Sequence, residues 1–352
     1  MLSLSAPDSS LLARSTPFVR LLSEAAAEIG VSLEMDGEYG FVGRLVDKDG
    51  RGYPIFGKSL GLNSDAAAHL AADKEYTARW LAASGLPTPN GQLVFNSTYC
   101  VRMALRNAET AARLPGKSVA ASFGEKHGWP VILKPNTGSE GRDIRLCTDA
   151  VHLAVELDRA LSSDEILRIE PCIPGRDYRV LVLDGDVVLA YERIPLSVTG
   201  DGTTPLGDLI DAALATLRKR HRGSKIAADD PRVLRRLAAD GHDLGTILTA
   251  GKKQRLLDNA NLSTGGALRD LTGQLPPEAE MLASRAAVSL GLRIAGVDIL
   301  APNLEDSTNG ATVLEVNSAP GLDYFATAAP QNWLRARAIV TRMLRARLGS
   351  GT

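Results

Sequence analysis

The sequence has few cysteines, few aromatic residues and no excess of either charge. Its 352 residues include three cysteines and no Cys-x-x-Cys pair, which excludes a disulfide framework and a zinc scaffold and favours a reduced, cytoplasmic protein. The 40 Lys and Arg residues balance 41 Asp and Glu residues, so the basic surplus of a general nucleic-acid binder is missing. No apolar run reaches the ~18 residues of a membrane-spanning helix, and the N-terminus lacks the apolar stretch of a signal peptide. We therefore expect no nucleic-acid partner and no membrane association.

What is present is typical of a folded α+β chain. Hydrophobic residues make up 44% of the sequence and charged residues 23%, which is ordinary for a globular protein. At ~100–200 residues per domain, the length gives two or three domains or one large α/β body. Hydrophobic spacing and turn residues predict helices at 15–29, 64–84, 118–127, 149–161, 281–290 and 330–348, and a mostly helical, charged segment at 205–243. The β-rich runs are 31–60, 130–135, 144–147, 165–170, 179–194, 295–301 and 311–317. Asp49-Gly50 and Asp184-Gly185 are hairpin turns.

Polar residues interrupt the two apolar strands near the C-terminus. Glu315 and Asn317 are two residues apart, so both project from one sheet face, and hairpin pairing can bring Asp298 beside them. Two carboxylates and an amide oxygen are costly to bury, and Mg²⁺, which prefers oxygen ligands, offsets that cost. A solvated sheet face is the alternative. The turn sequence directly after Asn317 favours a site.

A lysine ends the apolar strand at 130–135 and a glycine-containing loop follows. Lys134 either extends outward to solvent or meets an anion. Backbone N–H groups at Gly138 and Gly141 can converge on phosphate oxygens, with further donors from Thr137, Ser139 and Arg142. A plain surface loop is the alternative. The loop is not a P-loop, since it lacks the Gly-Lys-Ser/Thr ending.

A proline-flanked segment follows the strand at 165–170. Glu170 precedes Pro171, Cys172 and Ile173, and Gly175, Asp177 and Arg179 come next. Backbone groups of such a hinge can read an adenine edge, and an acidic side chain can accept ribose hydroxyls. A simple interdomain linker is the alternative.

These three features occur in the order typical of ATP-grasp ligases. The segments 191–210 and 258–272 resemble the ATP-grasp region of cyanophycin synthetases and the glutathione-synthetase half of bifunctional glutathione enzymes. The segment 73–89 resembles the lysine-bearing helix that precedes the core in this group and in D-alanine–D-alanine ligases. The resemblance covers about residues 55–348 and is most specific at 261–266. It implies an α+β ATP-grasp fold in which two lobes grip ATP after a short N-terminal pre-grasp region.

The resemblance also implies a division of the chain. The pre-grasp region is 1–72, a connecting helix and strand follow at 73–117, and the lid subdomain is 118–172. The C-terminal subdomain, 173–352, carries the metal and substrate site. We expect no second, Mur-ligase-like half and therefore no two-site polymerase.

Site roles follow by the same resemblance. Lys74 and Lys134 hold the ATP phosphates under the 137–142 loop, while Glu170, the backbone at 171–173 and Asp177 take adenine and ribose. Magnesium is bound by Asp298, Glu315 and Asn317. Arg179 and Arg193 face the transferring phosphoryl group or the substrate carboxylate, and Asn261 lines the cleft with the 263–266 turn. Where Glu140 stands, cyanophycin synthetases would carry a histidine.

Ordinary structural roles remain as alternatives for several of these residues. Lys74 can be a solvated helix lysine, Arg193 a sheet-edge ion-pair partner and Cys172 hinge packing. The arginines of the last helix can form a solvated face.

The resemblance implies an ATP-dependent carboxylate–amine ligase that forms a peptide or isopeptide bond through an acyl phosphate. Its cofactors are ATP and two Mg²⁺ ions, with Mn²⁺ as a substitute. Its substrates are amino acids or short peptides, and the resemblance suggests a homo-oligomer. The alternatives are a small-molecule kinase on the same fold and a catalytically silent nucleotide-binding module.

Overall fold

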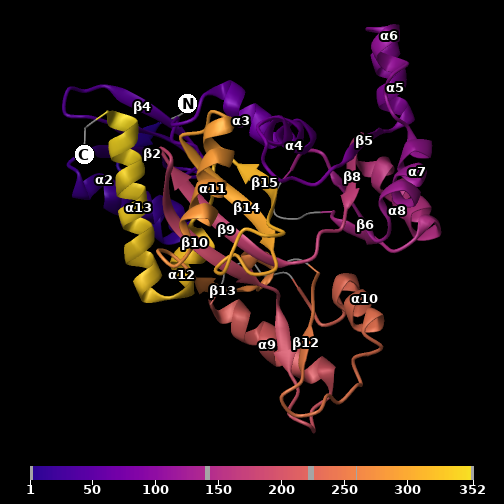
Figure 1. Cartoon of the computed structure of the whole chain (residues 1–352). Helices are drawn as coiled ribbons and strands as arrows, with labels where there is room; N and C mark the ends of the chain where they lie inside the picture. Colours follow the sequence, from indigo (N-terminus) through magenta and orange to yellow (C-terminus); the bar gives the residue numbers. More distant parts are fainter. Residues whose placement is uncertain (1–2, 139–142, 221–225, 259, 350–352) are drawn as a thin grey trace. The chain divides into compact units, whose positions relative to one another are not determined.

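The structure is a computed structural model that describes residues 3–138, 143–220, 226–258 and 260–349 (Figure 1). Its internal contacts divide the chain into two compact units. Unit 1 comprises Met1–Ser64, Val188–Gly273 and Ala319–Thr352. Unit 2 comprises Asp65–Val187 and Gln274–Ser318. Each unit is therefore assembled from segments that are distant in the sequence.

The N-terminal part of unit 1 is an antiparallel sheet covered by helices. Its elements are β1 (Leu4–Ser5), α1 (Ser9–Arg14), α2 (Pro17–Glu28), β2 (Ser32–Asp36), β3 (Val42–Val46) and β4 (Gly52–Phe56). The strand order is β1-β2-β3-β4, and the predicted hairpin turn at Asp49-Gly50 joins β3 to β4. Helix α2 buries an apolar face against β2 and against α13 (Pro330–Leu348), the helix at the end of the chain. Helix α12 (Asp323–Ala328) packs beside both α2 and α13.

The middle part of unit 1 has a second small core. Its elements are β10 (Asp186–Ile194, whose first two residues belong to unit 2), β11 (Ser197–Thr199), α9 (Leu206–Arg220), α10 (Pro231–Ala239), β12 (Lys253–Arg255), the 3₁₀ turn η1 (Leu262–Thr264) and β13 (Ala267–Asp270). Strand β10 pairs with β13 and β11 pairs with β12, both antiparallel. Leu206, Ile210 and Leu214 of α9 pack with Val233 and Leu237 of α10 in this core.

Unit 2 contains a four-stranded antiparallel sheet, ordered β5-β8-β6-β7. Its strands are β5 (Gln92–Phe95), β6 (Val131–Pro135), β7 (Arg145–Cys147) and β8 (Ile166–Pro171). Helices α7 (Lys117–His127) and α8 (Ala150–Ser163) cover one face, where Val131, Leu133, Leu167 and Ile169 are buried. We call it the β6/β8 sheet. Its other face carries the charged side chains of the same strands.

The remaining strands of unit 2 run antiparallel in the order β9-β14-β15. They are β9 (Arg176–Leu183), β14 (Ile294–Ala301) and β15 (Thr312–Asn317), and helix α11 (Pro277–Ser289) packs against all three. Strand β14 is almost wholly buried. Helices α3 (Asp65–Ala72) and α4 (Lys74–Ala83) pack against β15.

Most predicted elements are confirmed, including both hairpin turns and the C-terminal strand pair. The single helix predicted over 64–84 is wrong: it is broken into α3 and α4, because the Asp73 side chain accepts the Tyr76 N–H at 2.9 Å and starts a new helix. The sequence reading also missed α5 (Ser97–Ala104) and α6 (Ala108–Ala111), which project from the β6/β8 sheet (Figure 1). Among the described residues, no helix is both long and apolar enough to cross a membrane.

Candidate active site

A row of charged residues crosses the three antiparallel strands of unit 2. Asp298 in β14 lies directly opposite Arg179 in β9 on one side and Glu315 in β15 on the other. Asn317 comes two residues after Glu315 and shares its sheet face. The predicted pairing of Asp298 with the Glu-x-Asn strand is therefore confirmed. A β-bulge directly after Asp298 shifts the register, and the pairing then continues with Ile299 opposite Val313.

The carboxylate of Asp298 is 4% exposed and is held by Arg179. Arg179 donates through Nη2 to Asp298 Oδ2 at 3.0 Å and through Nε to Oδ1. Asn317 donates through its side-chain Nδ2 to Glu315 Oε1 at 2.8 Å. Its side-chain oxygen, which is an acceptor, takes no part in this bond. The row thus presents two carboxylates and one amide oxygen on the same face.

These donors suit a hard divalent cation by their chemistry. Magnesium prefers carboxylate and carbonyl oxygens and keeps part of its water shell, so two carboxylates and one amide are a sufficient protein ligand set. Among the described residues, no group of three or more His, Cys, Asp and Glu side chains forms a metal cluster. By their donor chemistry the residues present fit a magnesium ion, and they do not form a closed protein cage.

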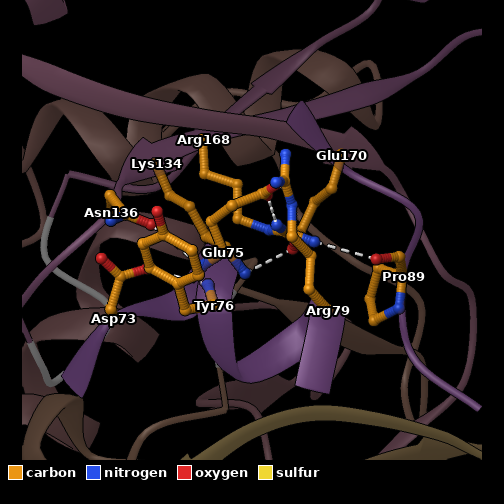
Figure 2. A network of polar contacts seen from close by, with 9 residues as sticks. All are labelled: Asp73, Glu75, Tyr76, Arg79, Pro89, Lys134, Asn136, Arg168 and Glu170. Atoms are coloured by element: carbon orange, nitrogen blue, oxygen red, sulfur yellow. Dashed lines mark hydrogen bonds and ion pairs between the residues drawn. The ribbon is translucent and has the colours of Figure 1, made fainter. Parts of the chain in front are cut away.

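The charged face of the β6/β8 sheet presents a buried lysine (Figure 2). Lys134 in β6 lies opposite Arg168 in β8, and its ammonium group pairs with Glu170 Oε1. Arg168 donates through Nε to the second oxygen, Glu170 Oε2, at 2.8 Å. All three side chains are less than 4% exposed. Lys134 is therefore buried beside an anion and does not extend to solvent. In this structure the anion is the Glu170 carboxylate.

Helix α4 places a second lysine near the same groups. Lys74 is the first residue of α4, and its ammonium Nζ donates to the Gly138 carbonyl at 2.9 Å. Burial lowers the pKa of Lys74, and the charge of Lys134 lowers it further, while Glu315 and Glu170 oppose this shift. The charges of Lys134 in the β6/β8 sheet and of Glu315 in β15 therefore both act on the pKa of Lys74.

The next residue of α4 joins the helix to the sheet. The Glu75 carboxylate accepts from Arg79 Nε at 2.7 Å and from Arg168 Nη1, and its backbone N–H donates to Asn136 Oδ1 at 3.0 Å. The Asn136 carbonyl accepts the Lys74 N–H at 3.1 Å. Figure 2 shows these side chains converging between α4 and the strands. The contacts fix the start of α4, and with it Lys74, to the end of β6.

The predicted hinge is the extended segment after β8. The Cys172 N–H donates to the Pro130 carbonyl at 3.2 Å, and residues 171–173 are half-buried. Gly175 has a φ of +152°, and a Cβ there would lie 2.9 Å from the Ala301 carbonyl oxygen, so the turn into β9 requires glycine. Asp177 follows in β9, two residues before Arg179 and on the same face.

The predicted phosphate loop is described in part. Thr137 and Gly138 are exposed and directly follow the buried Asn136. Ser139, Gly141 and Arg142, together with Glu140, lie outside the described residues.

Two predicted site residues belong to unit 1. Arg193 is a largely buried residue of β10 opposite Leu268 of β13. Asn261 precedes the 3₁₀ turn, where its carbonyl oxygen accepts the N–H groups of Thr264 at 3.1 Å and Gly266 at 3.2 Å. A Cβ at Gly266 would lie 2.8 Å from the Ala260 carbonyl oxygen, so this part of the family-like run has a packing reason for its glycine.

Comparisons with known proteins identify the fold. Residues 225–333 match the model of the RimK-like ATP-grasp domain. A bifunctional glutathione synthetase from Pasteurella multocida superposes on 96% of this chain, and 44% of its own, with a TM-score of 0.61 at 20% identity. The chain has the ATP-grasp fold. The fold class predicted from the sequence, α+β with an ATP-grasp arrangement, is confirmed.

The resemblance to particular ATP-grasp proteins is confirmed as well. Cyanophycin synthetase of Geminocystis herdmanii is 32% identical over 72% of this chain and 28% of its own length. The glutathione biosynthesis bifunctional protein of Streptococcus mutans is 30% identical over 71% of this chain and 32% of its own. This ATP-grasp chain therefore spans about a third or less of these relatives. ATP-grasp ligases use ATP with Mg²⁺.

Three residues that the structure places in this candidate site, namely Glu75, Asn136 and Arg168, were not predicted from the sequence. A signal for two of them is present, since Arg168 lies two residues before Glu170 and Asn136 two residues after Lys134. Glu315 and Asn317 have the same two-residue spacing, which places both side chains on one face of a strand. Glu75 has no such signal, because a charged residue on a helix is usually solvated.

Proposed function

We propose that this chain is an ATP-dependent carboxylate–amine ligase that forms a peptide or isopeptide bond through an acyl phosphate. The curated relatives are ATP-grasp carboxylate–amine ligases, and the chain spans a part of their length. The proposal therefore depends on the residues of this chain as much as on the relatives.

The observation that carries it is the position of Lys74 at the start of α4. Its backbone N–H donates to the Asn136 carbonyl, directly after β6, at 3.1 Å, and α4 packs against β15, the strand that carries Glu315. The charges of Lys134 and Glu315 both act on the pKa of the Lys74 ammonium group. A cationic pair beside an oxygen-ligand row is the arrangement that a magnesium-bound triphosphate needs.

In this proposal the nucleotide lies on the β6/β8 sheet. Lys134 and Lys74 contact the phosphates, with Thr137, Gly138, Ser139, Gly141 and Arg142 supplying the loop above them. Glu170 and the backbone of Pro171, Cys172 and Ile173 take the adenine, and Asp177 takes the ribose. Residues 118–172 act as the lid subdomain, 73–117 connect it to the pre-grasp region 1–72, and 173–352 carry the remaining site.

The metal ligands are Asp298, Glu315 and Asn317, which fit Mg²⁺ by their donor chemistry. Bound there, two Mg²⁺ ions (or Mn²⁺) neutralise the charge that develops on the transferring phosphoryl group. Arg179, already bidentate on Asp298, stays beside that charge. Arg193 faces the phosphoryl group or the substrate carboxylate, and Asn261 positions the substrate.

The chemistry needs positioning and charge neutralisation and uses no covalent protein nucleophile. A substrate carboxylate oxygen attacks the γ-phosphorus, and the bond from that phosphorus to the bridging oxygen breaks, releasing ADP. The substrate amine then attacks the acyl carbon, loses a proton and displaces phosphate. Lys74 and Lys134 hold the phosphate charges throughout, and closure over the site keeps water from the acyl phosphate.

The substrates are amino acids or short peptides. Glutamyl, aspartyl or short-peptide carboxylates are the acyl donors, and an amino-acid or peptide amine is the acceptor. A homo-oligomeric state is part of the proposal. A surface that binds nucleic acid is not.

A phosphate-release screen tests the activity. Purified protein is mixed with ATP, Mg²⁺ and pairs of amino acids or peptides, and each positive mixture is analysed by mass spectrometry for a product lighter by one water than its two substrates. Hydroxylamine added without the amine should give a hydroxamate, which only an acyl phosphate forms. A stable phosphorylated product would instead identify a kinase. ATP binding without turnover in every mixture would identify a silent nucleotide-binding module.

A further inference from the structure

The β6/β8 sheet holds a buried arginine that the proposed chemistry does not use. Arg168 is 1% exposed and is the largest fully buried side chain of the described residues. Its guanidinium has three partners, one for each nitrogen: Nε donates to Glu170 Oε2 at 2.8 Å, Nη1 to Glu75 Oε2, and Nη2 to the Pro89 carbonyl at 2.8 Å (Figure 2). Burying an arginine this deeply is unfavourable unless its charge is compensated.

The cluster around Arg168 is balanced in charge. Lys134 and Arg168 provide two positive charges, and Glu75 and Glu170 provide two negative charges, and all four side chains are buried. Glu170 is the member shared by both cations, since Lys134 holds one of its oxygens and Arg168 the other. Glu75 has a further partner in Arg79, on the solvent side of the same helix.

This arrangement bears on how Lys134 can serve a ligand. An ammonium group that is the sole partner of a buried carboxylate cannot turn to a phosphate without leaving that carboxylate uncompensated, which is strongly unfavourable. Glu170 has a second cation, so its charge stays compensated when Lys134 moves. Arg168 can remain in place during that exchange because Glu75 and Pro89 hold its other two nitrogens.

We propose that Arg168 is a positioning residue for nucleotide binding: it neutralises Glu170 and thereby makes Lys134 available to the phosphates. The inference rests on the proposed function for the identity of the ligand. Arg168 itself touches no substrate. Through Glu75 it also fixes the first turn of α4, which carries Lys74, so one guanidinium sets the position of both phosphate-binding lysines.

Gly91 lies directly against the Arg168 guanidinium. A Cβ at Gly91 would lie 2.5 Å from the Arg168 Cζ and Nη2 atoms. The substitution Gly91→Ala therefore displaces the guanidinium while it keeps every charge. It supplies a milder variant than removal of the arginine, and it is useful if Arg168→Met does not fold.

The test measures the binding of two probes to the full chain by calorimetry, with circular dichroism as the check of folding. The probes are Mg·ADP and magnesium tripolyphosphate. Tripolyphosphate lacks the base, so a contact between Glu170 and adenine does not enter its affinity. We expect Arg168→Met to weaken both probes about tenfold, the scale of one lost charge compensation. Arg79→Met is the matched control, because Arg79 also pairs with Glu75 but its side chain is 67% exposed, and we expect it to bind both probes as wild type does.

A double-mutant cycle separates this role from a merely structural one. If Arg168 acts by neutralising Glu170, then Arg168→Met should cost little tripolyphosphate affinity in the Glu170→Gln background, where no carboxylate competes for Lys134. An equal loss in both backgrounds, or no loss in either, would overturn the inference. The same cycle with Gly91→Ala gives the same two readings and replaces the first if Arg168→Met is unfolded.

The experiment also distinguishes this inference from the proposed function. If the wild-type chain binds Mg·ADP and the Arg168→Met chain binds it equally well, the positioning role is wrong and the proposed function stands. If the wild-type chain binds neither probe, the proposed nucleotide site fails and the inference fails with it. In an active preparation, the positioning role predicts a raised KM for ATP with a retained kcat.

Discussion

Removing the ammonium group of Lys134 gives the most quantitative test of the buried charge cluster. In Lys134→Met, the Glu170 Oε1 atom loses its ion-pair partner, while Oε2 keeps the 2.8 Å bond from Arg168 Nε. Breaking a buried ion pair usually costs about 3–5 kcal/mol because a bare charge remains. Since Arg168 still compensates Glu170, we expect a smaller decrease, about 2 kcal/mol, in the free energy of unfolding.

Urea unfolding followed by tryptophan fluorescence measures this effect. Trp129 packs against the apolar core of the β6/β8 sheet, so its emission reports on the part of the chain that carries Lys134. The slope of the unfolding free energy with urea should stay constant while the midpoint falls. The same variant should raise the KM for ATP sharply in the activity assay.

Two controls make the result interpretable. Lys117→Met removes a lysine from the exposed pair with Asp158 in the same unit, and it should cost no more than about 0.5 kcal/mol. The double variant Lys134→Met with Glu170→Gln should recover much of the lost stability, because no buried charge is then left short of a partner. If Lys134→Met costs no more than the surface control, or if the second substitution restores nothing, the pair does not carry the energy assigned to it.

Three further predictions concern other parts of the chain. Replacing both Glu315 and Asn317 with alanine should abolish ADP formation without unfolding the protein, because these residues are half-buried; turnover retained in a folded variant would count against the metal assignment. Burial lowers the pKa of Lys74, and only its cationic form attracts phosphate. The kcat/KM for ATP should therefore fall as the pH rises, and the fall should begin below the pH at which an ordinary lysine loses its proton. Lys74→Arg should move that fall to higher pH, and an unchanged pH profile would remove Lys74 from the site. Gly266→Ala should lower the free energy of unfolding by about 2 kcal/mol because its Cβ would press on the Ala260 carbonyl, whereas Gly37→Ala, with open space at its Cβ, should change it little; equal urea midpoints would refute the packing argument.

The strand-borne part of the site could be predicted because strands have a period of two. Glu315 and Asn317 stand out as polar residues on one face of an apolar strand, and the hairpin sequence brings Asp298 opposite them. The same rule, applied to the strand before the hinge, would have found Arg168 beside Glu170. Local sequence thus predicts the Asp298, Glu315 and Asn317 group and three of the four members of the buried cluster, all but Glu75.

The fourth member, Glu75, depends on a contact between distant segments, which local periodicity does not encode. Glu75 is the second residue of α4, and nothing nearby in sequence shows that its carboxylate meets Arg168, 93 residues later. The break between α3 and α4 was missed for a related reason. The alanine-rich run favours one long helix, and the Asp73 cap outweighs that preference where the chain must bring Lys74 next to Asn136.

The charged groups assigned to ligand binding are already engaged within the chain. Lys134 is paired with Glu170, Asp298 with Arg179, and the Lys74 ammonium with the Gly138 carbonyl. Binding of a magnesium nucleotide is therefore an exchange of partners, and its affinity reflects the difference between old and new contacts rather than their sum. A single substitution in such a site removes a ligand contact and an internal partner together. The role of each charge is consequently resolved only when the charge and its partner are changed both singly and together.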